Sequence, residues 1–205
     1  MGPLSGLRRV CVFCGSRTGR RPEYQAAAER LGRLLAERRI ELVYGGGNVG
    51  LMGVVADACL EAGGSVNGVI PEALVGREVA GRAVEHSGLT RLEVVGSMHT
   101  RKARMAQLAD GFIALPGGFG TFEELFEILT WAQLGFHGKP IGLLDVADYF
   151  APLRALCDSA LAEGFLNVAS RALLLSHTVP AALLEAMAAH RPAPVTPWIR
   201  EEKEL

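Results

Sequence analysis

Residues 115–124 (LPGGFGTFEE) constrain the fold of this chain more than any other stretch. An apolar run, residues 111–115, leads into three glycines, a threonine and two carboxylates, and a segment with helical periodicity, residues 125–134, follows at once. A buried strand that ends in a glycine turn at the start of a helix is how α/β proteins present backbone N–H groups to a phosphate. The glycines let the backbone approach a ligand, and the helix N-terminus adds about half a positive charge. This stretch therefore predicts a phosphate-binding turn.

Short apolar runs alternate with amphipathic segments of helical length along the rest of the chain. Such alternation predicts a mainly parallel sheet with helices on both faces. We therefore expect an α/β fold, with residues 1–190 forming a single doubly wound, Rossmann-like nucleotide-binding domain and residues 191–205 a poorly ordered tail. The expected strands are residues 10–13, 42–44, 66–70, 92–95, 111–115, 141–144 and, at an edge, 173–175; the expected helices are residues 22–38, 51–62, 97–108, 125–134, 149–163 and 179–190.

Residues 71–89 interrupt this alternation, because they show no clean period and contain three glycines. They predict a long loop with room for a helical turn. Loops of this length inside a compact domain are usually functional or mobile.

The composition narrows the class of protein. The chain has 205 residues, of which 49% are hydrophobic and 21% charged, and its formal net charge is −1. This balance is typical of a soluble globular domain and provides no basic excess for binding nucleic acid. No apolar stretch reaches the ~18 residues of a membrane span, and no signal peptide opens the chain, so we expect a cytoplasmic protein that does not bind a membrane.

The four cysteines are Cys11, Cys14, Cys59 and Cys157. Cys11 and Cys14 have the spacing of a metal-binding pair, but they lie in and just after an expected strand, where residues three apart point to opposite faces. We expect buried free thiols and no metal site.

Three glycine turns follow expected strands, at residues 15–16, 45–50 and 117–121. Because the carboxyl ends of parallel strands meet at one edge of the sheet, these turns should converge on one crevice. Residues 45–50 also fit the dinucleotide fingerprint G-x-G-x-x-G, but the acidic residue expected about twenty positions later is missing, since Glu61 and Glu72 do not end the next strand. Tight packing of helix on sheet is the simpler explanation for some of these glycines.

Thr121 and Glu124 are three residues apart at a helix start, which is the spacing of a capping box. A cap alone does not require three preceding glycines, so a functional role for Glu124 competes with the structural one. Arg101, Lys102 and Arg104 would usually form a solvated helix face. Here they follow a strand directly, so they should face the same crevice, where cations could hold a phosphate.

Residues 98–105 (MHTRKARM) followed by residues 116–124 (PGGFGTFEE) resemble the paired signature of the LOG (Lonely Guy) family. The resemblance extends over roughly residues 10–165. Further stretches that resemble the family pattern are residues 14–16, 44–53, 68–71 and 130–135.

The resemblance implies a cytokinin riboside 5′-monophosphate phosphoribohydrolase. Such enzymes hydrolyse the N-glycosidic bond of N6-modified adenosine monophosphate, and often of AMP itself, without a cofactor and as homodimers. Relatives are often labelled possible lysine decarboxylases, but a pyridoxal enzyme needs a Schiff-base lysine. The lysines of this chain are Lys102 in the signature, Lys139 before a proline, and Lys203 in the tail.

Arg101 and Glu124 match the pair that the resemblance implies to be catalytic, and the stretch between Glu78 and Arg101 looks a few residues longer than is usual in the family. Together with the crevice residues above, the matches predict a substrate-binding set of Gly15, Ser16, Glu78, Lys102, Gly117, Gly118, Phe119, Gly120, Thr121 and Thr130.

The chemistry follows from the bond that breaks. Cleavage at C1′ passes through an oxocarbenium-like state, so a carboxylate at Glu124 could stabilise the developing positive charge and activate the attacking water. The alternative is a non-catalytic nucleotide-binding or sensing module on the same fold. Both need the glycine turns and Arg101, but only hydrolysis needs Glu124.

Overall fold

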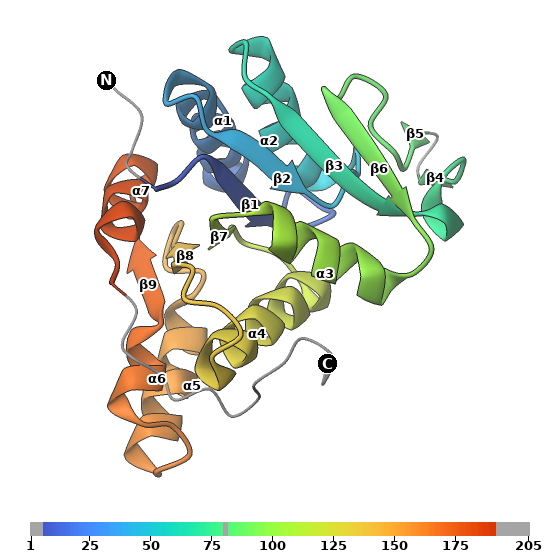
Figure 1. Ribbon diagram of the computed structural model, residues 1–205. Coiled ribbons are helices and arrows are strands. Elements are labelled where there is room, and N and C mark those ends of the chain that lie inside the picture. The colour runs from blue at the N-terminus through green and yellow to red at the C-terminus, as the bar shows by residue number, and fades with distance from the viewer. Residues whose placement is uncertain (1–5, 80–81, 192–205) are drawn as a thin grey trace.

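The computed structural model describes residues 6–79 and 82–191, and most of these residues belong to one sheet and the helices around it (Figure 1). The strands of the main sheet are β1 (Arg9–Phe13), β2 (Glu41–Tyr44), β3 (Val66–Pro71), β6 (Arg91–Val95), β7 (Gly111–Ala114), β8 (Ile141–Leu144) and β9 (Leu174–His177). The helices are α1 (Pro22–Glu37), α2 (Gly50–Glu61), α3 (Met98–Leu108), α4 (Phe119–Leu134), α5 (Ala151–Ala162), α6 (Val168–Ala172) and α7 (Pro180–Ala189).

The seven strands lie in the order β6-β3-β2-β1-β7-β8-β9, and every neighbouring pair is parallel. From β1 the chain builds the sheet outward in one direction as far as β6, then returns to the other side of β1 with β7. The strand order therefore reverses between β1 and β7. Ligands of doubly wound proteins bind beyond the carboxyl ends of the strands, at the point where the strand order reverses. The glycine turns after β1 and β7 both lie at this point.

The sheet separates two hydrophobic cores. Helices α1, α2 and α7 pack on one face, and α3, α4 and α5 pack on the other, as expected for a doubly wound fold. Cys14 belongs to the first core and Cys11 to the second, which confirms that these cysteines point to opposite faces. All four cysteines are buried and free.

The long segment after β3 has more structure than the sequence predicted. It contains a short turn of helix, Glu72–Leu74, and a small antiparallel pair, β4 (Glu78–Val79) and β5 (Arg82–Ala83). Its end is held against the second glycine turn, because the Asn48 N–H donates to the Val84 carbonyl at 2.7 Å and the His86 N–H donates to the Gly46 carbonyl at 3.0 Å. The segment is thereby fixed next to the carboxyl end of β2.

The start of α4 differs from the predicted one. The helix begins at Phe119, with Gly118 as its N-cap, and no side chain caps it. Thr121 is buried in the first turn, so the predicted capping box between Thr121 and Glu124 is wrong. Helix α6 was not predicted. The predicted tail cannot be compared, because residues 192–205 lie outside the described residues. In the part of the chain that the structure describes, no helix combines the length and apolarity needed to cross a membrane.

Candidate active site

The glycine turns after β1 and β7 meet, as the sequence predicted. The Gly15 N–H donates to the Pro116 carbonyl at 3.1 Å, and the Gly15 carbonyl accepts the N–H of Leu51, at the start of α2, at 2.9 Å. A cavity of about 580 Å³ opens beside these turns, at the reversal of strand order. Its lining residues are Gly15, Ser16, Arg17, Thr18, Gly19, Tyr24, Leu51, Pro116, Gly117, Gly118, Phe119 and Tyr149.

The glycines of the α4 turn serve two different purposes. A Cβ atom on Gly117 would lie 2.1 Å from Thr121 Oγ1 and 2.8 Å from the Gly15 nitrogen, so the fold itself requires glycine there. A Cβ atom on Gly118 or Gly120 would meet nothing within 4 Å. Neither packing nor a positive φ explains these last two glycines, and close approach of a ligand to the backbone is the usual remaining reason.

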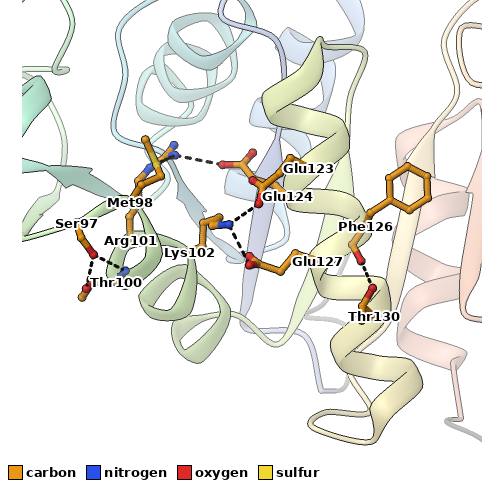
Figure 2. A network of polar contacts seen from close by, with 10 residues as sticks. All are labelled: Ser97, Met98, Thr100, Arg101, Lys102, Glu123, Glu124, Phe126, Glu127 and Thr130. Carbon is orange, nitrogen blue, oxygen red and sulfur yellow. Dashed lines mark hydrogen bonds and ion pairs between the residues drawn. The ribbon is translucent and has the colours of Figure 1, made fainter. Parts of the chain in front are cut away.

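Arg101 and Glu124 face one another across the gap between α3 and α4 (Figure 2). Helix α3 begins at Met98, because Ser97 Oγ accepts the Thr100 N–H at 3.1 Å, and this places Arg101 in the first turn. Arg101 Nη1 lies 3.2 Å from Glu124 Oε1, and the two side chains are only 13% and 12% exposed. The structure thus brings together the two residues predicted to be catalytic, in a mostly desolvated ion pair.

The guanidinium group of Arg101 is seated over the ends of β2 and β3. Its Nε donates to the Val69 carbonyl at 3.1 Å, and its Nη2 occupies the place where a Cβ atom on Gly45 would lie, only 1.8 Å away. Gly45 is therefore needed to make room for Arg101. The contact between Gly45 and Arg101 was not predicted, because nothing in the local pattern shows which distant side chain this glycine faces.

Burial raises the pKa of Glu124 to about 7, against the opposing effect of the Arg101 charge. Lys102 also lowers this pKa, whereas Glu123 and Glu127 raise it. A carboxyl group that titrates near neutrality can exchange protons with a substrate or a water at physiological pH. Such a group suits general acid–base work far better than an ordinary surface glutamate.

Several predicted substrate contacts line or support the cavity. Ser16 and Phe119 are exposed at its wall, and Phe119 is 93% exposed although it is a large apolar side chain. Thr121 lies underneath the turn, against Gly117. Tyr149, which the sequence analysis missed, donates a hydrogen bond from its hydroxyl to the Gly117 carbonyl and so supports the turn from the side of α5.

Lys102 and Thr130 do not line this cavity, and neither Arg101 nor Glu124 is among its lining residues. Lys102 Nζ binds the carboxylates of Glu123 and Glu127. Thr130 is exposed on the opposite side of α4, where its hydroxyl donates to the Phe126 carbonyl at 2.7 Å (Figure 2). Glu78 lies in β4, and its side chain is outside what the structure describes.

Lys139 and His137 are both partly buried and hydrogen-bonded to backbone carbonyls. Lys139 Nζ donates to the Ala106 carbonyl at 2.7 Å, and burial lowers its pKa. Lys203 lies outside the described residues. The ring of His137 hydrogen-bonds the Ile128 carbonyl at 3.1 Å, and burial lowers its pKa to about 4. Within residues 6–79 and 82–191, no group of three histidine, cysteine, aspartate or glutamate side chains could hold a metal ion.

Fold and site together define a Rossmann-like α/β protein with glycine turns at the reversal of strand order and a buried arginine–glutamate pair. Solved structures agree with the fold. A molybdenum cofactor binding protein from Rippkaea orientalis superposes with a TM-score of 0.65 at 21% identity, covering 88% of this chain and 95% of that one. The molybdenum cofactor carrier protein of Chlamydomonas reinhardtii gives a TM-score of 0.64 at 20% identity, with 89% and 98% covered.

Sequence comparison defines the family more narrowly. The profile of a family described as possible lysine decarboxylase matches residues 52–187. A cytokinin riboside 5′-monophosphate phosphoribohydrolase of Arabidopsis thaliana is 52% identical over 172 residues, covering 84% of this chain and 77% of the relative. A probable enzyme of the same name from Oryza sativa subsp. japonica is 47% identical over 205 residues, with 98% and 90% covered. The chain belongs to this family, the LOG family, as its signature residues predicted.

Proposed function

We propose that the protein hydrolyses the N-glycosidic bond of adenosine 5′-monophosphates, with or without an N6 substituent, and releases the free base and ribose 5-phosphate. The observation that carries the proposal is the buried pair of Arg101 and Glu124 beside the glycine turn of α4. Relatives about 50% identical over most of this chain are named as phosphoribohydrolases of this kind. No described lysine is placed for the decarboxylase chemistry that the family description suggests.

The phosphate binds at the start of α4 in this proposal. The backbone N–H groups of residues 117–121 and the positive end of the helix supply the anion site. Open space around Gly118 and Gly120 supports this placement, because a ligand can come into contact with the backbone there. Glu124 then lies in the second turn of the same helix, on the side that faces Arg101.

Arg101 orients the sugar, and Glu124 carries out the chemistry. As the bond between C1′ and the base breaks, positive charge develops on the ribose, and the carboxylate of Glu124 stabilises it. The same carboxylate accepts a proton from the attacking water. Because Arg101 is fixed by Val69 and Glu124 together, the pair is already organised before substrate arrives, which lowers the cost of reaching the transition state.

A product assay tests the proposal. Purified protein is incubated with AMP, isopentenyl-AMP, CMP, GMP and IMP, and free base and ribose 5-phosphate are measured by chromatography. Release of adenine or isopentenyladenine, faster than of the other bases, is the expected result. Thermal stabilisation by AMP without any release of base would instead identify a nucleotide-binding module.

Activity and stability should respond to pH in opposite directions. Base catalysis needs ionised Glu124, so kcat/KM for AMP is expected to rise with pH through about 7. The pKa of this group is 4.5 in its ordinary state and about 7 in the folded protein, so between these values the folded chain holds a proton that the unfolded chain has lost. The free energy of unfolding should therefore fall over that interval as pH rises. Chemical denaturation at pH 5 and pH 8, compared for wild type and Glu124→Gln, measures this contribution; equal pH dependence in both would contradict it.

We also propose that the protein is a cytoplasmic homodimer. Four buried free cysteines suit a reducing compartment. Thr130, predicted to contact substrate, points away from Glu124 within its own chain, and in a dimer it would be free to contact a nucleotide bound by the second copy. Phe126, Leu156, Phe165 and Val168 are exposed on or beside α4, α5 and α6, as expected for a covered face. Light scattering after gel filtration is expected to give twice the chain mass, and Phe165→Glu is expected to give the single-chain mass; a monomeric wild type would refute the dimer.

A further inference from the structure

Lys102 is bound by two carboxylates of α4 and is nearly inaccessible. Its Nζ lies 2.9 Å from Glu127 Oε1 and makes a short hydrogen bond to Glu123 Oε1. The Lys102 side chain is only 9% exposed. Glu123 and Glu127 are four residues apart, so they project from the same side of α4 in successive turns, and the ammonium group lies between them (Figure 2).

This arrangement makes Lys102 a poor phosphate ligand. An ammonium group has three N–H donors, and the two carboxylates already take two of them. The cluster of one lysine and two glutamates carries a net charge of −1, which repels a phosphate dianion. Burial lowers the pKa of Lys102, but the hydrogen bonds to Glu123 and Glu127 raise this pKa above its ordinary value. The positive charge of Lys102 is therefore already stabilised by protein groups.

The same arrangement fixes the geometry of the neighbouring pair. Lys102 directly follows Arg101 in α3, and Glu123 directly precedes Glu124 in α4, so the two ion-pair systems cross the same interhelical gap side by side. Rotation or sliding of α3 that broke the Lys102 contacts would also displace Arg101 from Glu124. Elsewhere α3 is held to the sheet by the pair of Arg104 Nε and Glu93 Oε2 at 2.6 Å, which does not involve α4.

We propose that Lys102 is a positioning residue: it clamps α3 to α4 through Glu123 and Glu127, and thereby sets the approach of Arg101 to Glu124. This role rests on the proposed function, because the rate of AMP hydrolysis is the quantity most sensitive to the position of Arg101.

The clamp also acts on the charge state of Glu124. The groups that act on this carboxyl are Arg101 and Lys102 of α3, and Glu123 and Glu127 of its own helix. The thiols of Cys11 and Cys14 in and after β1 also interact with it, but they are buried and un-ionised. Loss of the Lys102 charge should therefore move the rise of kcat/KM to higher pH, whereas loss of the Glu127 charge should move it to lower pH.

The test is steady-state kinetics with AMP on Lys102→Met, Lys102→Arg, Glu127→Gln and the double variant Lys102→Met/Glu127→Gln. A misplacement of about 1 Å can cost ~10²-fold in rate, so Lys102→Met is expected to lose kcat by roughly that factor while KM stays within about threefold. Lys102→Arg should recover most of the loss, and the double variant should be no slower than Lys102→Met alone. The matched control is Arg104→Met, which breaks an ion pair of the same helix that does not act on Glu124; it should lower the unfolding temperature without shifting the pH profile.

A rise in KM of more than about tenfold at unchanged kcat, with Glu127→Gln like wild type, would overturn the proposal and make Lys102 a substrate ligand.

If Lys102→Met fails to fold, Lys102→Arg and Glu127→Gln give the same comparison. If wild type releases no base from AMP, the proposed function fails, but the clamp is still measurable from unfolding temperatures. Loss of the Lys102 and Glu127 charges should then be strongly non-additive, and additive effects would refute the clamp.

Discussion

Replacing Glu124 by Gln is expected to lower kcat for release of adenine from AMP by about 10³-fold or more, because one substitution removes both charge stabilisation and the base. Glutamine keeps the size of the side chain and can still accept a hydrogen bond from Arg101, so the gap between α3 and α4 should keep its shape. The lost property is the negative charge, which a developing oxocarbenium ion needs. Free adenine measured by chromatography over long incubations gives the residual rate.

Binding separates this result from a folding defect. Because the glycine turn holds the phosphate in our proposal, AMP and ribose 5-phosphate should still raise the unfolding temperature of Glu124→Gln. Glu29→Gln is the matched control, since Glu29 Oε1 only accepts a hydrogen bond from Gln25 on the exposed side of α1. Base release by Glu124→Gln at the wild-type rate would exclude this carboxylate from the chemistry.

The architecture could be predicted because each strand of the main sheet has a recognisable local sequence pattern. Runs such as residues 141–144 are apolar, short and bounded by a proline or a charge, and the alternation with helices allows few arrangements other than a parallel sheet. Helix α6 and the pair β4–β5 were missed because they are too short to show a period. Their structure depends on contacts with segments distant in sequence, such as the hydrogen bond from Asn48 to Val84.

The sequence predicted that Arg101 and Glu124 lie together, but not the contacts that hold them. Residues 117–121 look like an anion-binding turn from local pattern alone, and the family resemblance selected Arg101 and Glu124. The supposed capping box failed because Gly118 already ends the preceding turn and starts α4 earlier. The partners of Lys102 could not be foreseen, since a basic residue beside Arg101 is equally compatible with a ligand, a solvent-exposed face and a clamp.

Gly45→Ala is expected to lower kcat for AMP by about 10²-fold, although residue 45 itself has no reactive group. The added Cβ would lie 1.8 Å from Arg101 Nη2, far inside van der Waals contact, so one of the two must move. The guanidinium is the far end of a flexible side chain, whereas Gly45 directly follows the buried strand β2. Arg101 should therefore swing away from Val69 and Glu124, at little cost to the fold. The measurements are kcat for AMP and the unfolding temperature of the same preparation.

Two comparisons identify displacement of Arg101 as the cause. Gly96→Ala adds a methyl group where nothing lies within 4 Å, so it should match wild type in rate and stability. Gly45→Ala combined with Arg101→Met should be no slower than Arg101→Met alone, because both substitutions remove the same interaction. Multiplied rate losses in the double variant would show that Gly45 acts by another route, such as direct contact with the nucleotide. A loss in Gly45→Ala that disappears in the Arg101→Met background would show instead that the glycine is there for the arginine.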